Sequence, residues 1–180
     1  MKIVGIDPGT STLGVAVLTG DTVVQHITAT TITPWQRYKQ DYFAEPREWV
    51  TAHQRTQYLM ETLNAYLPQD TEGIAIESPF FDRFRPFAYG VLLQHQLSIK
   101  SLIQRRYPWI PVTDVAPSEA KKAIGYKKKS TLTTKESVTY ALQNHSVIAP
   151  LINLNRLDEH SQDAISIAYA LWQSLIELTP

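Results

Sequence analysis

The sequence predicts an α/β fold: a mixed five-stranded sheet, opened by a three-strand antiparallel meander and flanked by helices. Two observations point to it. Short β-branched or apolar runs alternate with helical patterns in the order βββαβαβααα. The chain has 180 residues, of which 43% are hydrophobic, enough for one domain over residues 1–180 with a substantial core.

The first three segments are typical of an antiparallel meander. Residues 2–7, 12–18 and 22–31 are rich in Val, Ile and Thr, and Thr19-Gly20-Asp21 supplies a turn between the last two. The apolar runs 74–77 and 110–115 complete the five predicted strands.

Helical patterns follow the meander. They cover residues 48–67, 89–107, 118–125, 133–144 and 159–178, and Pro68 and Pro108 stop the first two. Before them, residues 32–46 contain two prolines among aromatic and polar residues, so we expect an irregular excursion there.

The composition limits the cellular compartments and the kinds of partner that fit this protein. The chain has no cysteine, which suits a reducing cytoplasm, and no run approaches the 18 apolar residues of a membrane span. Its first residues lack the ordered regions of a signal peptide, so we expect a cytoplasmic protein without membrane contact. Formal net charge is zero, so any argument for nucleic acid has to come from local clustering.

Two predicted strands end in an acid that a proline follows within two residues. Asp7 stands in GIDPGT and Glu77 in IAIESPF. If the strands are neighbours, both carboxylates emerge at a sheet edge of the kind that binds ligands. Close carboxylates repel unless a proton or a cation lies between them. Each acid alone is also compatible with a turn or an exposed strand end.

The last predicted helix carries His160 and Asp163, which the spacing places on one helix face. Acids in its first turn, such as Glu159, also gain about 0.3–1 kcal/mol from the helix dipole. With Asp7 and Glu77, the pair would form a hard-oxygen site with one imidazole, suited to Mg²⁺ or Mn²⁺. Two such ions roughly 3.5–4 Å apart are the usual device for in-line phosphodiester cleavage.

A lysine-rich segment favours a phosphodiester substrate. Residues 121–135 hold no acid, and such a run either neutralises phosphates or forms a solvated loop. The lysines expected to contact DNA or the scissile phosphate are Lys121, Lys122, Lys127, Lys128, Lys129 and Lys135.

Aromatic rings and arginines alternate just after Glu77, a pattern that stacks on unpaired bases or opens a junction. The residues expected to contact DNA are Phe80, Phe81, Arg83 and Arg85. Phe87 and Tyr89, at the start of the next helix, are expected in the core.

These blocks, in this order, resemble the RuvC family of Holliday junction resolvases, including its phage-type members. GIDPGT resembles the family's opening strand, IAIESPF the strand with the second acid, and HSQDAISIAYA the final helix. The resemblance implies a ribonuclease-H-like fold and assigns the catalytic acids to Asp7, Glu77 and Asp163. His160 stands where many members carry Asp and some carry His. Asp158 is an alternative fourth ligand.

The segment APSEAKKAIGYKKKSTLTTKESVTYAL resembles the family's basic pair of helices. Lys135 then matches a lysine near the scissile phosphate, and Lys121 matches another. Phe80 matches an aromatic that contacts the bases of the junction. Residues 32–49 are longer and more aromatic than the family's usual connection.

The resemblance implies a metal-dependent, structure-selective endonuclease that resolves four-way junctions and acts on other branched DNA. It implies two Mg²⁺ ions per site, with Mn²⁺ as the alternative, and the catalytic set Asp7, Glu77, His160, Asp163 and Lys135. It also implies a homodimer, for which helix 90–107 has apolar residues on more than one side. Such an enzyme works in a bacterial or phage-infected cell.

Two other functions fit parts of the sequence. GID-x-GTS also resembles the phosphate loop of actin-like ATPases, which favours a nucleotide-binding phosphotransferase, although no second glycine-rich loop follows. His160 in place of an acid is compatible with a junction-binding protein that has lost catalysis.

Overall fold

The structure is a computed structural model that describes residues 1–9, 11–33, 52–80, 86–128 and 130–178. Its centre is a five-stranded sheet in the order β3-β2-β1-β4-β5, which confirms the predicted mixed sheet. The strands are β1 (Lys2–Pro8), β2 (Leu13–Gly20), β3 (Val24–Ile32), β4 (Gly73–Glu77) and β5 (Val112–Val115).

The strand directions explain why two distant acids meet. β1, β2 and β3 pair antiparallel as the predicted meander, whereas β4 runs parallel to β1 and β5 runs parallel to β4. Ile6 lies opposite Ile76 in the β1–β4 ladder, so the next residues, Asp7 and Glu77, leave the sheet at the same edge.

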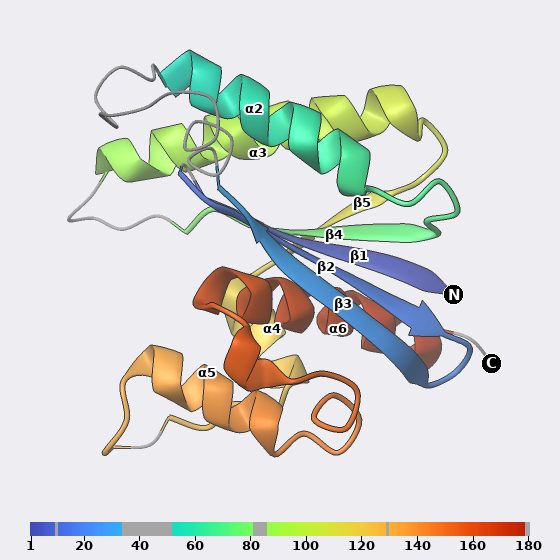
Figure 1. Cartoon of the computed structure of the whole chain (residues 1–180), viewed down its shortest axis with the longest axis vertical. Coiled ribbons are helices and arrows are strands. Elements are labelled where there is room, and N and C mark those ends of the chain that lie inside the picture. Colours follow the sequence, from blue (N-terminus) through green and yellow to red (C-terminus); the bar gives the residue numbers. More distant parts are fainter. Residues whose placement is uncertain (10, 34–51, 81–85, 129, 179–180) are drawn as a thin grey trace.

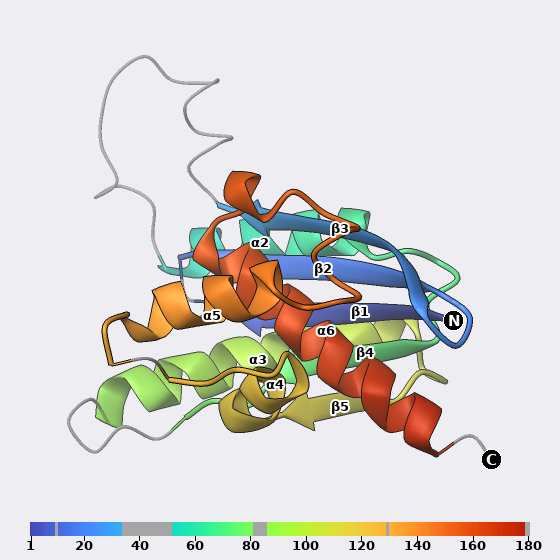
Figure 2. The ribbon, with the colours of Figure 1, turned by 90° about the horizontal axis from the view of Figure 1, so that it is seen from below.

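Helices cover both faces of the sheet (Figure 1, Figure 2). One face packs on α2 (Ala52–Tyr66) and α3 (Pro86–Arg106) through a core that includes Leu59, Leu63 and Ile99. The other face packs on α6 (Glu159–Glu177), and α4 (Pro117–Ala123) and α5 (Thr134–Gln143) pack against α6. The sheet's inner strands are therefore buried on both faces, and their polar ends mark the accessible edge.

Helix α6 lies unusually close to the sheet because two glycines face it. A Cβ atom at Gly5 would lie 2.2 Å from the carbonyl oxygen of Ala164, and one at Gly14 would lie 2.1 Å from that of His160. Without side chains at these positions, the first turns of α6 reach the end of β1.

The predicted elements shift modestly in the structure. α3 begins at Pro86 rather than at residue 89, since proline fits the first turn of a helix. β5 begins at Val112, and a short 3-10 helix, η1 (Leu154–Arg156), was not predicted. Most of the predicted excursion at 32–46 lies outside the described residues.

The expectation that Phe87 is a core residue is wrong. Phe87 is 89% exposed, and the first turn of α3 extends beyond the sheet (Figure 1). Tyr89 is half-buried.

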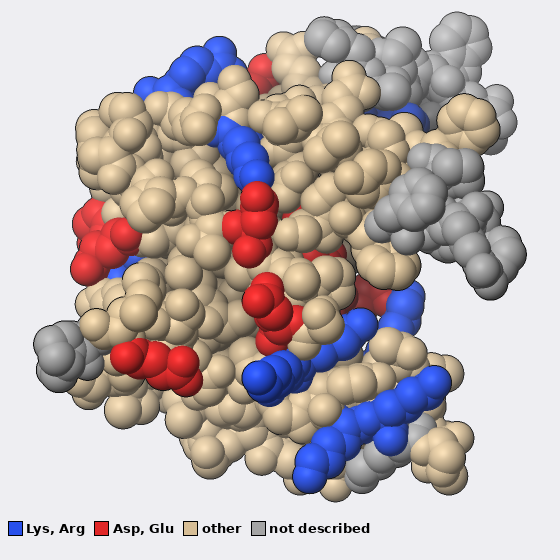
Figure 3. Space-filling view, turned by 180° about the vertical axis from the view of Figure 1, so that it is seen from behind, with Lys and Arg blue, Asp and Glu red and all other residues tan. Residues whose placement is uncertain are grey.

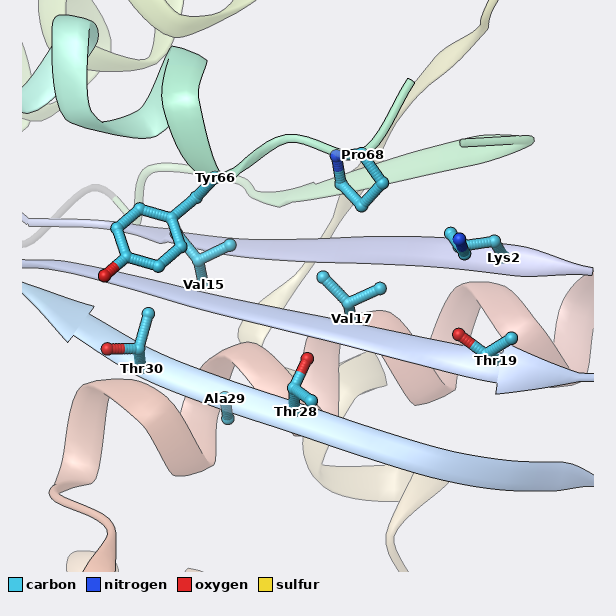
Figure 4. A pocket seen from close by; sticks show the side chains of 9 residues that line it. All are labelled: Lys2, Val15, Val17, Thr19, Thr28, Ala29, Thr30, Tyr66 and Pro68. Carbon is cyan, nitrogen blue, oxygen red and sulfur yellow. The ribbon is translucent and has the colours of Figure 1, made fainter. Parts of the chain in front are cut away.

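A cavity of about 360 Å³ opens over β2 and β3 beside the C-terminal end of α2 (Figure 4). Valines and threonines form most of its lining, and no lining residue is acidic. The lining residues are Lys2, Val15, Val17, Thr19, Thr28, Ala29, Thr30, Tyr66 and Pro68. It therefore lacks the carboxylates of the predicted chemistry. Within the described ranges, no helix combines the length and apolar character needed to cross a membrane.

Candidate active site

Asp7, the residue before the last one of β1, has a nearly buried carboxylate that faces α6. Asp7 is 8% exposed, and its Oδ2 lies 2.7 Å from Nδ1 of His160. The turn after the strand uses only its backbone, since the N–H of Gly9 donates to the Asp7 carbonyl at 3.1 Å. The carboxylate is thus free for chemistry while the main chain makes the turn.

Glu77 lies beside Asp7, as the parallel pairing of β1 and β4 requires. Burial raises the pKa of Glu77 to about 8, and the negative charges of Asp7 and Asp163 and a hydrogen bond with Asp7 act in the same direction. Burial and the nearby negative charges thus both favour the protonated form of Glu77.

Asp163 joins this cluster from α6. Burial raises its pKa to about 6, Asp7 adds to the rise, and the positive charges of Lys121 and His160 oppose it. The mutual effects of Asp7, Glu77 and Asp163 show that side chains from two strand ends and the last helix share one environment.

His160 links Asp7 to Thr12, the residue directly before β2. Its Nδ1 contacts Asp7, and its Nε2 lies 2.8 Å from the hydroxyl of Thr12. The hydrogen bond with Asp7 raises the pKa of His160 despite partial burial. Both ring nitrogens therefore have partners, and the ring is held in one orientation.

Asp158, the alternative to His160 as fourth ligand, has a structural role instead. It caps α6: its Oδ1 accepts the N–H of Ser161 at 2.9 Å and also the hydroxyl of Thr31. Capping is the usual use of Asp at this position. His160, one turn before Asp163, is the residue that contacts Asp7.

The donor set suits a divalent metal, although the described residues include no three His, Asp or Glu side chains arranged as ligands. Three clustered carboxylates are the oxygen donors that Mg²⁺ and Mn²⁺ prefer. The raised pKa values of Glu77 and Asp163 come from burial and from unbalanced negative charge, which a divalent cation would neutralise.

Lysines border the acids. Lys121, at the end of α4, is close enough to lower the pKa of both Glu77 and Asp163. Lys135 begins α5 and forms an ion pair with Glu159 on α6. Figure 3 shows Lys and Arg side chains beside recessed acidic atoms at the level of α4 and α5. Lys122, Lys127 and Lys128 are exposed, and Lys129 lies outside the described residues.

The structure also describes only some of the residues that were predicted to contact DNA after Glu77. Phe80 follows the end of β4 and is 71% exposed, which is unusual for a large apolar ring and fits a surface contact. Phe81, Arg83 and Arg85 lie outside the described residues.

Two residues near the site have contacts that the sequence did not indicate. Thr12 bonds His160, and Glu159 pairs with Lys135 and lies 3.9 Å from Nε2 of His160. Nothing in the sequence around Thr12 distinguishes it from the threonines of the neighbouring strands. The position of Glu159 next to His160 could have indicated a residue near the site. An acid in the first turn of a helix is explained equally well by the helix dipole.

No protein-family model matches the chain, and no curated protein matches it in sequence. Solved structures do match. RuvC of Thermus thermophilus has 20% identity and a TM-score of 0.66, covering 99% of this chain and 98% of that one. T. thermophilus RuvC in complex with Holliday junction substrate has 21% identity and a TM-score of 0.58, covering 98% and 96%.

A virus protein matches as well. The Fowlpox virus resolvase, solved with its substrate Holliday junction DNA, has 14% identity and a TM-score of 0.55, covering 97% of this chain and 99% of that one. The chain therefore has the ribonuclease-H-like fold of RuvC-type resolvases over nearly its whole length.

Proposed function

We propose that this chain, with its RuvC-type fold, is a single-domain, metal-dependent endonuclease that resolves Holliday junctions in the cytoplasm of a bacterial or phage-infected cell. The observation that carries the proposal is the convergence of Asp7, Glu77, His160 and Asp163 at one sheet edge beside Lys121. The structural neighbours that share the fold are resolvases, two of them solved with junction DNA.

In this proposal, Asp7, Glu77 and Asp163 hold two Mg²⁺ or Mn²⁺ ions, with His160 beside them. When bound, such ions activate water and stabilise the leaving oxygen of a phosphodiester. The ends of β1 and β4 fix the positions of Asp7 and Glu77. The close packing of α6 on Gly14 fixes the positions of His160 and Asp163.

His160 orients the first acid. With Thr12 on Nε2 and Asp7 on Nδ1, the imidazole holds one Asp7 oxygen and leaves the other for a cation. Direct binding of a cation by Nε2 requires that Thr12 give up its contact.

Lysines and Phe80 supply the DNA contacts. Lys135 leaves Glu159 to contact the scissile phosphate, Lys121 neutralises charge next to the acids, and the exposed lysines of residues 122–128 bind the backbone of the arms. The exposed ring of Phe80 stacks on bases near the point where the strands exchange.

The proposed enzyme is a homodimer because two strands of a junction are cut together. The outward side of α3 offers exposed apolar side chains for a second copy: Phe87 at 89%, Val91 at 44% and Leu97 at 56%. Apolar groups of this kind on one helix are typical of an interface.

Cleavage of four-way, three-way and linear duplex DNA, side by side in Mg²⁺, Mn²⁺ and Ca²⁺, tests this function. We expect cutting of the four-way junction in Mg²⁺ or Mn²⁺, with the linear duplex left intact. Binding to the junction without cleavage in either metal would select an inactive junction-binding protein. Tight ATP binding in calorimetry, with no DNA binding, would select the phosphotransferase.

A further inference from the structure

Gln96 is one of two buried polar residues in the described part of α3, the other being His95. It is 3% exposed, near the fully buried Ile99 and Ile103 of the same helix. A buried amide among apolar groups costs free energy unless it is hydrogen-bonded. Its partners therefore explain its presence.

The Gln96 side chain donates to the ends of two strands. Its Nε2 lies 2.7 Å from Oδ1 of Asp114 on β5 and 3.3 Å from the carbonyl oxygen of Glu77 on β4. Both partners are acceptors, so they require the NH₂ group at this position and use one hydrogen each. Lys100, one turn further along α3, contacts the same carboxylate at 2.7 Å.

The end of β4 needs such a tether. Glu77 is the last residue of a five-residue strand, and beyond it Ser78 donates to Val115 at 2.9 Å before Pro79, which has no N–H. Glu77 is hydrogen-bonded to Asp7 and lies near Asp163, so a small displacement of this strand end would move its carboxyl group out of the cluster. The bond from Gln96 to the Glu77 carbonyl acts directly on the backbone that carries the carboxylate.

We propose that Gln96 is a positioning residue that fixes the backbone of Glu77 for cleavage by tying α3 to the ends of β4 and β5. The role rests on the proposed nuclease function but extends it to a residue that touches neither metal nor DNA. The same helix presents Leu97 outward, so the tether also connects the proposed dimer helix to the site.

The substitution Gln96→Glu tests this role because it keeps the shape of the side chain and removes both donors. We expect kcat for junction cleavage to fall roughly 10- to 100-fold, as for a misplaced catalytic group, with KM unchanged. The Kd for Mn²⁺ should rise. Hydrogen exchange of the 73–78 backbone in the metal-free protein should become faster. Gln69→Glu, an exposed site in the loop before β4, is the matched control and should change none of these.

The double variant Gln96→Glu with Asp114→Asn separates positioning from general stability. The amide introduced at position 114 can donate to the carboxylate introduced at position 96, so the bond between the two side chains returns, whereas the bond to the Glu77 carbonyl does not. We expect the unfolding midpoint to recover while kcat and the exchange of 73–78 stay impaired. This variant also carries the test if the single variant does not fold.

Two results would overturn the role of Gln96: wild-type cleavage and exchange in the single variant, or full recovery of both in the double variant. Hydrogen exchange and Mn²⁺ binding need no DNA. If the wild-type chain cuts no branched DNA, the nuclease function fails, while these two measurements still decide whether Gln96 holds Glu77.

Discussion

Nδ1 of His160 lies 2.7 Å from Oδ2 of Asp7, a residue 153 positions earlier in the chain. This contact joins the first strand to the last helix at the edge of the sheet. It brings an imidazole to a carboxylate that also has Glu77 and Asp163 as neighbours.

Gly14→Ala should destabilise the fold, because its Cβ would lie 2.1 Å from the His160 carbonyl oxygen and 2.6 Å from the carbonyl carbon. Overpacking of this kind costs about 1–3 kcal/mol or more. Urea unfolding measures the loss. Gly90→Ala is the control: outside the backbone of its own helix, no atom of the described residues lies within 4 Å of an added Cβ, and alanine should stabilise α3 by about 0.5–1 kcal/mol. Equal midpoints for the two variants would show that α6 does not depend on this close approach.

The metal-free protein should lose stability as pH rises. The pKa of Glu77 is about 8 in the folded chain against 4.5 for an ordinary Glu, and that of Asp163 is about 6 against 3.8. The folded state therefore binds more protons than the unfolded state between about pH 4 and 8, so its relative free energy rises with pH. His160 acts in the same sense, since its pKa is raised by Asp7.

Thermal unfolding between pH 5 and 8.5 checks this pH dependence. The midpoint should fall with pH in chelator, and Mn²⁺ should restore it most at the alkaline end. Glu77→Gln should flatten the slope, and Glu61→Gln, on the exposed side of α2, should not. A midpoint that rises with pH in the wild type would contradict the charge excess at the site.

Glu159→Gln should strengthen junction binding, because Glu159 competes with the phosphate for Lys135. The pair is largely exposed, and such pairs are worth about 0–1 kcal/mol, so the Kd should fall by no more than about fivefold at low salt. Fluorescence anisotropy in Ca²⁺ measures it. Glu177→Gln removes the same charge at the other end of α6 and should have little effect. Weaker junction binding by Glu159→Gln, or an equal gain in Glu177→Gln, would contradict a competition between Glu159 and the phosphate for Lys135.

Thr12→Val should slow cleavage about fivefold, since it removes one hydrogen bond of roughly 1 kcal/mol from the His160 ring. Junction affinity in Ca²⁺ should not change, because Thr12 acts on the ring and not on DNA. Single-turnover kinetics measure the rate, with Ser11→Ala as an exposed neighbour for comparison. A wild-type rate would remove Thr12 from the site.

The sequence was informative where local chemistry decides the structure. Alternating β-branched residues predicted β1–β3, and the acid-then-proline ends predicted that Asp7 and Glu77 would emerge together, which the parallel pairing of β1 and β4 confirms. The Thr133–Glu136 capping box sets the start of α5 where the helical pattern placed it.

Contacts between residues that are far apart in the chain could not be predicted from the sequence. Phe87 has the composition of a core residue, but its burial depends on where α3 passes the edge of the sheet. Gln96 and Thr12 carry no local signal, since their partners lie 18 and 148 positions away. Asp158 was the alternative to His160, and its hydrogen bond from the N–H of Ser161 accounts for it as the helix cap.

Cleavage of a synthetic four-way junction in Mg²⁺ by wild type and by Asp7→Asn is the most direct test of the convergent acidic site. The substitution keeps the shape of the side chain and removes the charge that the cations need. The account predicts that Asp7→Asn binds the junction nearly as tightly as wild type and does not cut it, while Asp21→Asn in the β2–β3 turn cuts normally. Cleavage by Asp7→Asn at the wild-type rate would contradict the account.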